Sequence, residues 1–164
     1  MIFHRLTDRL AVSDAPADSD LPQLTAQGFR SIIDLRADGE PRPRGVAPWD
    51  EARLAAEHGL AYRQIPVEPP RLGDHLGDLI RRVVREAIPP VLLHCTTGRR
   101  AGVFGLIAVA CDERLSAEEC LERGRAIGLS FEGMPRLTAF LKHYLERHAA
   151  VPDGSETKRH LASW

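Results

Sequence analysis

The sequence predicts an α/β domain with a mostly parallel central sheet and helices on both faces. Short runs rich in Ile, Val and Leu, bounded by Gly or Pro, alternate with longer patterns of helical period. Each strand pattern is followed by a helix pattern, an order typical of parallel sheets. The chain has 164 residues, 43% of them hydrophobic, which suits a single domain with a substantial core.

Three central strands are predicted by the runs at 29–36, 60–67 and 90–95. The start of the chain, 2–12, is expected to add one or two edge strands. In a sheet of this kind ligands bind at the carboxyl ends of the strands. The loops that follow Arg36, Val67 and Cys95 should therefore share the face that carries the site.

Helices are predicted between and after these strands. Ser116 and Glu119 form a capping-box pattern at the start of one of them. After residue 147 the apolar period is lost and Pro, Gly and charged residues gather. We therefore expect one domain over 1–147 and a loosely ordered tail over 148–164. The helical patterns cover 18–28, 49–59, 73–87, 99–112, 116–127 and 135–147.

Composition limits the partners and the compartment. Lys and Arg number 22 against 23 Asp and Glu, a net charge of −1, so the basic excess of a nucleic-acid-binding protein is absent. The longest apolar run, 101–111, is well short of the ~20 residues that span a bilayer, and the first residues lack a signal-peptide pattern. Three cysteines, an odd number, favour free thiols in a reducing compartment. We expect a soluble, cytoplasmic protein that binds neither nucleic acid nor membrane.

The segment 91–102 carries the strongest chemical signal. A buried strand ends at Cys95, a short polar loop with Gly98 follows, and a helix opens with Arg99 and Arg100. Free backbone N–H groups and the positive end of a helix dipole favour an anion at such a loop, and they favour the thiolate form of the cysteine. Cys95 would then act as a nucleophile and Arg100 as a bidentate ligand for phosphoryl oxygens. The alternative is that Cys95 is a structural thiol.

This segment resembles the signature of cysteine-dependent protein tyrosine and dual-specificity phosphatases. The stretches 28–36 and 56–67 are similar to the order strand, Leu-Arg, helix, Gly, strand, Ile-Pro-Val of those enzymes. The resemblance extends over about 3–128 and implies their α/β fold and hydrolysis of phosphate monoesters, with phosphotyrosine proteins or small phosphorylated molecules as substrates. It also implies that Cys95 forms a cysteinyl-phosphate, while Arg100 and the loop residues hold the phosphate. Those loop residues are Thr96, Thr97, Gly98 and Arg99.

The number of residues between the cysteine and the arginine indicates which families the segment resembles most. Four residues separate Cys95 from Arg100, whereas the standard phosphatase motif has five. The shorter form resembles the bacterial phosphatase-like domain of beta-lactamase-hydrolase-like proteins, and it also occurs in rhodaneses, which carry a persulfide on the cysteine. The Gly-His-Ile-x-Gly-Ala segment of rhodaneses is absent after the strand ending at Arg36, and His94 before the cysteine fits the phosphatases better. A rhodanese-like sulfurtransferase stays as the alternative.

A second departure is Ala101, where phosphatases commonly have a Ser or Thr that helps the thiolate leave. Thr96 or Thr97 could supply that hydroxyl instead. The departure also keeps open a third hypothesis, an inactive phosphate-binding module. Cys111 and Cys120 lie in helical patterns and are interpreted as core or surface thiols.

Leaving-group protonation needs a carboxylic acid on a neighbouring loop. By resemblance the acid follows Ile-Pro-Val, which makes Glu68 the first choice for the catalytic acid, with Asp74 and Asp38 as alternatives. The competing interpretation of Glu68 is a solvated loop residue.

The loop 36–44 combines arginines with acids and prolines. Its arginines, Arg36, Arg42 and Arg44, could steer an anionic substrate, although a solvated rim is the more common arrangement. The seven histidines include no metal-binding motif, so no metal and no cofactor is expected.

Overall fold

The computed structural model describes residues 1–40 and 48–148, and its centre is a five-stranded sheet in the order β1-β2-β5-β3-β4. β1 pairs antiparallel with β2, and the other neighbouring strands are parallel. The predicted fold class is thereby confirmed. The strands are β1 (Phe3–Arg5), β2 (Leu10–Ser13), β3 (Ser31–Asp34), β4 (Ala61–Gln64) and β5 (Val91–His94).

The start of the chain differs from the expectation in one respect. It forms two strands, but only β1 lies at the edge, because β2 sits between β1 and β5. All four residues of β2 are buried. Leu10 and Val12 face one layer of the core and Ala11 faces the other, as expected for a strand covered on both sides. Only four residues long, this run shows no clear alternation in the sequence.

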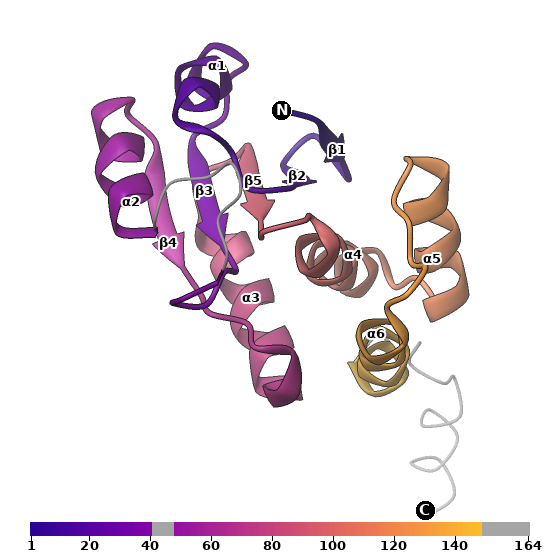
Figure 1. The fold of residues 1–164 in the computed structure, drawn as a ribbon. Coiled ribbons are helices and arrows are strands. Elements are labelled where there is room, and N and C mark those ends of the chain that lie inside the picture. Colours follow the sequence, from indigo (N-terminus) through magenta and orange to yellow (C-terminus); the bar gives the residue numbers. More distant parts are fainter. Residues whose placement is uncertain (41–47, 149–164) are drawn as a thin grey trace, which may run out of the picture.

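Helices cover both faces of the sheet (Figure 1). α1 and α2 lie on one face, α3 and α4 lie on the other, and α5 and α6 pack beyond α4. The capping box of Ser116 and Glu119 is confirmed, since the Glu119 amide donates to Ser116 Oγ over 3.2 Å and the Ser116 amide donates to the Glu119 carboxylate over 2.8 Å. The helices are α1 (Leu21–Ala26), α2 (Pro48–Glu57), α3 (Asp74–Glu86), α4 (Arg99–Glu113), α5 (Ala117–Ala126) and α6 (Pro135–His148), with short 3-10 turns η1 (Asp18–Asp20) and η2 (Pro69–Arg71).

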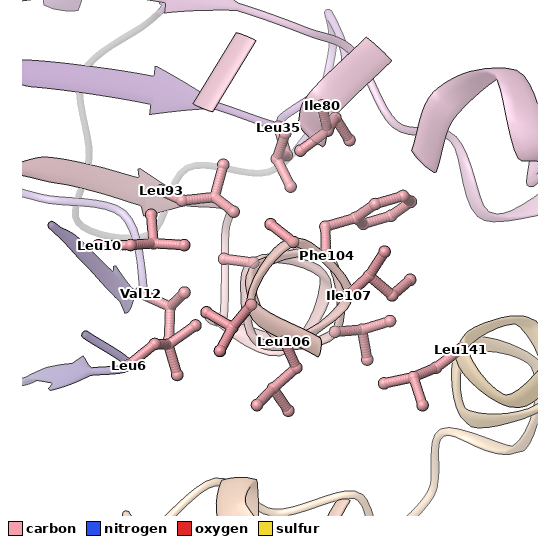
Figure 2. Packing of buried hydrophobic residues seen from close by; sticks show 14 of the residues in the cluster. Leu6, Leu10, Val12, Leu35, Ile80, Leu93, Phe104, Leu106, Ile107 and Leu141 are labelled. Carbon is pink, nitrogen blue, oxygen red and sulfur yellow. The ribbon is translucent and has the colours of Figure 1, made fainter. Parts of the chain in front are cut away.

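Helix α4 is the centre of the larger core layer. Every residue from Arg100 to Ala110 is buried, because α4 packs against the sheet on one side and against α3, α5 and α6 on the others. Figure 2 shows the helix end-on, with Phe104, Leu106 and Ile107 directed into the surrounding apolar side chains. The position of α4 fixes the loop that precedes it, and that loop begins at Cys95.

Glycine at position 105 allows this close packing. A Cβ there would lie 2.6 Å from Val12 Cγ1 and 2.7 Å from Leu6 Cδ1. Valine has little freedom to rotate away, so we expect Gly105→Ala to lower the free energy of unfolding by about 1 to 2 kcal/mol, even though alanine favours helix. Gly102→Ala in the same helix is the matched control, because its Cβ would meet only Leu129, at 3.5 Å. Urea unfolding should show Gly102→Ala as stable as the wild type or more stable; equal stability of the two variants would contradict this account.

The predicted tail lies outside the described residues from 149 onward, so the domain boundary stays a prediction. Within 1–40 and 48–148, no helix is both long and apolar enough to cross a membrane.

Candidate active site

Four parallel strands end at the same edge of the sheet. In register, Ser13 and Asp34 both lie beside His94, and Gln64 lies beside Asp34. The loops after β3, β4 and β5 therefore share one face, as predicted. The loop after β2 joins them there, a contribution that the sequence analysis missed because this strand was assigned to the edge.

The Cys95 loop has the predicted strand–loop–helix geometry. β5 ends at His94, Cys95 is fully buried, and α4 begins at Arg99. Gly98 adopts a φ of +79°, which side-chain-bearing residues rarely take. A Cβ at this position would also lie 3.2 Å from the backbone of Ser13. Glycine is therefore needed twice here, for the turn and for its contact with the end of β2.

The guanidinium of Arg100 is held from three sides. Nη1 donates to the carbonyl oxygens of Leu35 (3.3 Å) and Val67 (2.8 Å), which follow β3 and β4 at the starts of the two neighbouring loops. Nη1 and Nη2 each lie 2.5 Å from a carboxylate oxygen of Glu40. Burial by itself would lower the pKa of Arg100, but hydrogen bonding to Glu40 and the charge of Cys95 outweigh it and raise the pKa. Arg100 is thus a fixed cation beside Cys95.

Glu40 is the site residue that the sequence analysis did not single out. Besides Arg100, its carboxylate accepts hydrogen bonds from Thr96 Oγ1 (2.6 Å) and from the amide of Ala37 (2.8 Å). Burial tends to raise the pKa of this carboxyl, but these hydrogen bonds and the charge of Arg100 lower it to about 2. The only signal in the sequence was an acid shortly after β3. Its partner is 60 residues away, so spacing could not reveal the pair.

The low pKa of Glu40 predicts a stability effect in acid. A carboxyl whose pKa is lowered on folding stabilises the protein when the pH is above the pKa of that group in the unfolded chain, about 4.3. This contribution is lost as the pH falls toward 2, the pKa of Glu40 in the folded protein. The wild type should therefore exceed Glu40→Gln in melting temperature at pH 6, and the gap should narrow as the pH falls from about 5 to about 2. A gap that stays constant over this range would contradict the assignment.

A buried charge cluster lies behind Cys95. Nε2 of His94 is 2.8 Å from the Glu51 carboxylate, and the guanidinium of Arg36 contacts both Glu51 and Asp34. Tyr62 donates to Asp34 over 2.9 Å, and burial raises the pKa of this phenol, so it stays protonated. Burial opposes ionisation of Asp34, but the charges of His94 and Arg36 lower its pKa. The cluster fixes the end of β5 from which Cys95 projects.

Arg36 corrects one sequence interpretation. Its side chain is 1% exposed and paired with two carboxylates, so it neither steers a substrate nor lies on a solvated rim. Arg42 and Arg44 lie outside the described residues. Asp34, Glu51 and His94 bring ligand atoms within 4.8 Å of one another, a spacing that would suit a metal ion, but Arg36 already supplies the cation between the two carboxylates.

A cleft of about 750 Å³ opens on this face of the molecule. Its walls include Glu68 and Asp38, two of the three predicted proton donors, together with Arg100. Asp74 is not brought to the cleft; it pairs with Arg147 (2.5 Å) and His148 (3.0 Å) of α6. Other lining residues are Ala37, Gly39, Glu40, Pro69, Pro70, Thr97, Arg99, Gly133, Met134, Pro135, Arg136 and Leu137.

The loop threonines have different positions. The hydroxyl of Thr96 is bonded to Glu40, whereas Thr97 is exposed and lines the cleft. Ala101 is fully buried below the loop.

Cys111 is half-buried and Cys120 buried, and burial raises the pKa of both thiols, that of Cys120 to about 12. These two cysteines are therefore poor nucleophiles.

Residues 2–111 match the family model "Beta-lactamase hydrolase-like protein, phosphatase-like domain". The chain belongs to this family. A beta-lactamase hydrolase-like protein of Agrobacterium fabrum is 33% identical over 149 residues, which cover 90% of this chain and 33% of the relative. A relative from Xylella fastidiosa is 31% identical over 123 residues, covering 75% of this chain and 28% of that protein. The chain thus spans about a third of the length of these curated relatives.

Solved structures of low sequence identity share the fold. Tk-PTP, in a mutant form, aligns with a TM-score of 0.74 at 23% identity over 88% of this chain and 95% of that one. PTPMT1 aligns with a TM-score of 0.72 at 15% identity over 88% and 94% of the two chains. A cysteine-to-serine variant of P. aeruginosa TpbA, in complex with pTyr, has a TM-score of 0.67 at 17% identity over 85% and 82%. The tyrosine-phosphatase-like fold is therefore established.

Proposed function

We propose that this domain is a cysteine-dependent phosphatase that hydrolyses phosphate monoesters. The observation that carries the proposal is the fixed guanidinium of Arg100, held beside Cys95 at the mouth of the cleft by Leu35, Val67 and Glu40. A preorganised cation at the position where phosphoryl charge develops is a main source of catalysis in such sites. Family membership and the pTyr complex of TpbA support the same activity.

The reaction has two steps. The Cys95 thiolate attacks phosphorus, the S–P bond forms and the ester P–O bond breaks, while a carboxylic acid donates its proton to the departing oxygen. Water then attacks the cysteinyl-phosphate and gives a proton to the carboxylate left by the first step, the new O–P bond forms, and the S–P bond breaks to return the thiolate and release phosphate. The backbone N–H groups of the loop and the start of α4 stabilise the phosphoryl oxygens together with Arg100. Because Cys95 is fully buried, the loop or Glu40 must yield slightly to admit the phosphoryl group.

Glu68 is the proposed proton donor. It is half-exposed, lines the cleft and forms an ion pair with Arg71 at 3.2 Å, from which it can turn into the cleft. For Glu68→Gln we expect kcat on an aryl phosphate to fall by about 10- to 100-fold. The fall of kcat at high pH, where the acid of the wild type is deprotonated, should also disappear in this variant. Asp38→Asn is the matched comparison, since Asp38 lines the same cleft but accepts a hydrogen bond from Gln64. A larger loss in Asp38→Asn would transfer the role to Asp38.

Sulfur transfer is the second candidate, favoured by the four-residue spacing between Cys95 and Arg100. Purified protein should be assayed with p-nitrophenyl phosphate and, separately, with thiosulfate plus cyanide. The phosphatase proposal expects release of p-nitrophenol and no thiocyanate. Thiocyanate formation without phosphate-ester hydrolysis would identify a sulfurtransferase. Inactivity in both assays, with tight binding of orthovanadate, would identify a phosphate-binding module.

A further inference from the structure

The cleft at Arg100 is lined by two further arginines that have no acidic partner among the described residues. Two of the acids that line it are paired with arginines, Glu40 with Arg100 and Glu68 with Arg71, and the third, Asp38, accepts a hydrogen bond from the neutral amide of Gln64. Arg99 and Arg136 also line the cleft and are exposed. The side chain of neither arginine forms an ion pair or a hydrogen bond with a residue in 1–40 or 48–148. Two arginine side chains without an ion-pair partner therefore line the same cleft as the Asp38 carboxylate.

Both arginines occupy positions that are unfavourable for the fold alone. Arg99 opens α4 and Arg136 is the second residue of α6, so each places a cation at the positive end of a helix dipole. By contrast, α2, α3 and α5 carry acidic residues in their first turns, as the dipole favours. Neither α4 nor α6 has an acid in its first turn. An anion bound between the two side chains would offset the cost of these placements.

We propose that the cleft accepts substrates with two anionic groups, in which Arg99 and Arg136 bind a second phosphate or a carboxylate while Arg100 holds the phosphoryl group that is cleaved. This inference rests on the phosphatase function proposed above and names its substrate class: small phosphate monoesters with a neighbouring anion. The cleft volume of about 750 Å³ accommodates such a molecule. Glu68 lines the same cleft, so the bond to be cleaved and the second anion can lie together within it.

Binding to the Cys95→Ser protein tests this class without requiring turnover. The ligands are glycerol 2-phosphate, 2-phosphoglycerate and 2,3-bisphosphoglycerate, which add a carboxylate and then a second phosphate to one carbon skeleton. Calorimetry should show both phosphoglycerates binding at least about fivefold more tightly than glycerol 2-phosphate, the gain expected for a partly exposed ion pair. Equal affinities, or no binding of any of the three, would overturn the proposal.

Arginine variants locate the second anion. In the same background, Arg136→Gln and Arg99→Gln should each reduce the preference for the phosphoglycerates by about fivefold. Arg82→Gln is the matched control, because it removes one positive charge from an exposed position of α3 outside the cleft and should leave the preference unchanged. A preference that survives both cleft variants, or that falls equally in the control, would overturn the proposal. Failure of the phosphatase function shows separately, as absence of Cys95-dependent hydrolysis of p-nitrophenyl phosphate by the wild type.

Discussion

Replacement of Cys95 by serine is expected to lower kcat for p-nitrophenyl phosphate by a factor on the order of 10⁴ or more, since it removes the proposed nucleophile. A serine hydroxyl has almost the same size as the thiol, but it is not ionised at neutral pH. Cys95 packs in the apolar core at the end of β5, and the substitution conserves its volume. The variant should therefore stay folded and still bind phosphate, with the loss confined to turnover.

Cys111→Ser provides the control for general effects of removing a thiol. Cys111 is half-buried on α4, away from the Cys95 loop, and its variant should retain activity within about twofold. If Cys95→Ser kept a substantial fraction of wild-type activity in the same assay, the cysteine-dependent mechanism would be wrong.

Arg100→Lys is expected to reduce kcat/KM by about 100- to 1000-fold, although the positive charge is kept. Lysine has no planar fork, so it cannot hold Glu40 with one edge and phosphoryl oxygens with the other. It also cannot reproduce the contacts of Nη1 with the Leu35 and Val67 carbonyls. Steady-state kinetics and phosphate inhibition constants should both show the loss, and a change of less than about threefold would contradict the role of Arg100.

In Arg100 variants, folding stability can be restored by a second substitution while activity stays lost. Arg100→Ala leaves the Glu40 carboxylate without its cation, which we expect to cost about 1 to 3 kcal/mol of folding free energy. Adding Glu40→Gln removes the unpaired charge and should restore most of that stability without restoring activity. Recovery of activity in the double variant would mean that Arg100 acts only through the fold.

The local part of this architecture could be predicted from the sequence. The Cys95 loop, its glycine and the following helix lie within one short segment, where residue order reports structure directly. The shared face of the loops after β3, β4 and β5 follows from the alternation of strands and helices. The position of Glu68 on the cleft wall was anticipated from the same topology and from the family resemblance.

The site residues that could not be predicted have contact partners far away in the sequence. The acidic loop after β3 suggested a solvated rim, yet Glu40 meets Arg100 and Thr96 across the sheet edge. Arg36 is buried with its ion-pair partner Glu51, which α2 supplies from 15 residues away, and no local pattern distinguishes this arginine from an exposed one. Asp74 fits the sequence criteria for a proton donor but pairs with the last turn of α6.

Direct detection of the phosphoenzyme tests the central claim most closely. The wild type should be mixed with excess p-nitrophenyl phosphate, quenched in acid within one turnover, digested and examined by mass spectrometry. The account predicts one added phosphoryl group on the peptide that contains Cys95 and none on the same peptide of Cys95→Ser. The phosphorylated peptide should accumulate in Glu68→Gln only if Glu68 also assists the second step. Hydrolysis that proceeds at the wild-type rate with the phosphoryl group on another residue, or with release of phosphate from Cys95→Ser, would contradict it.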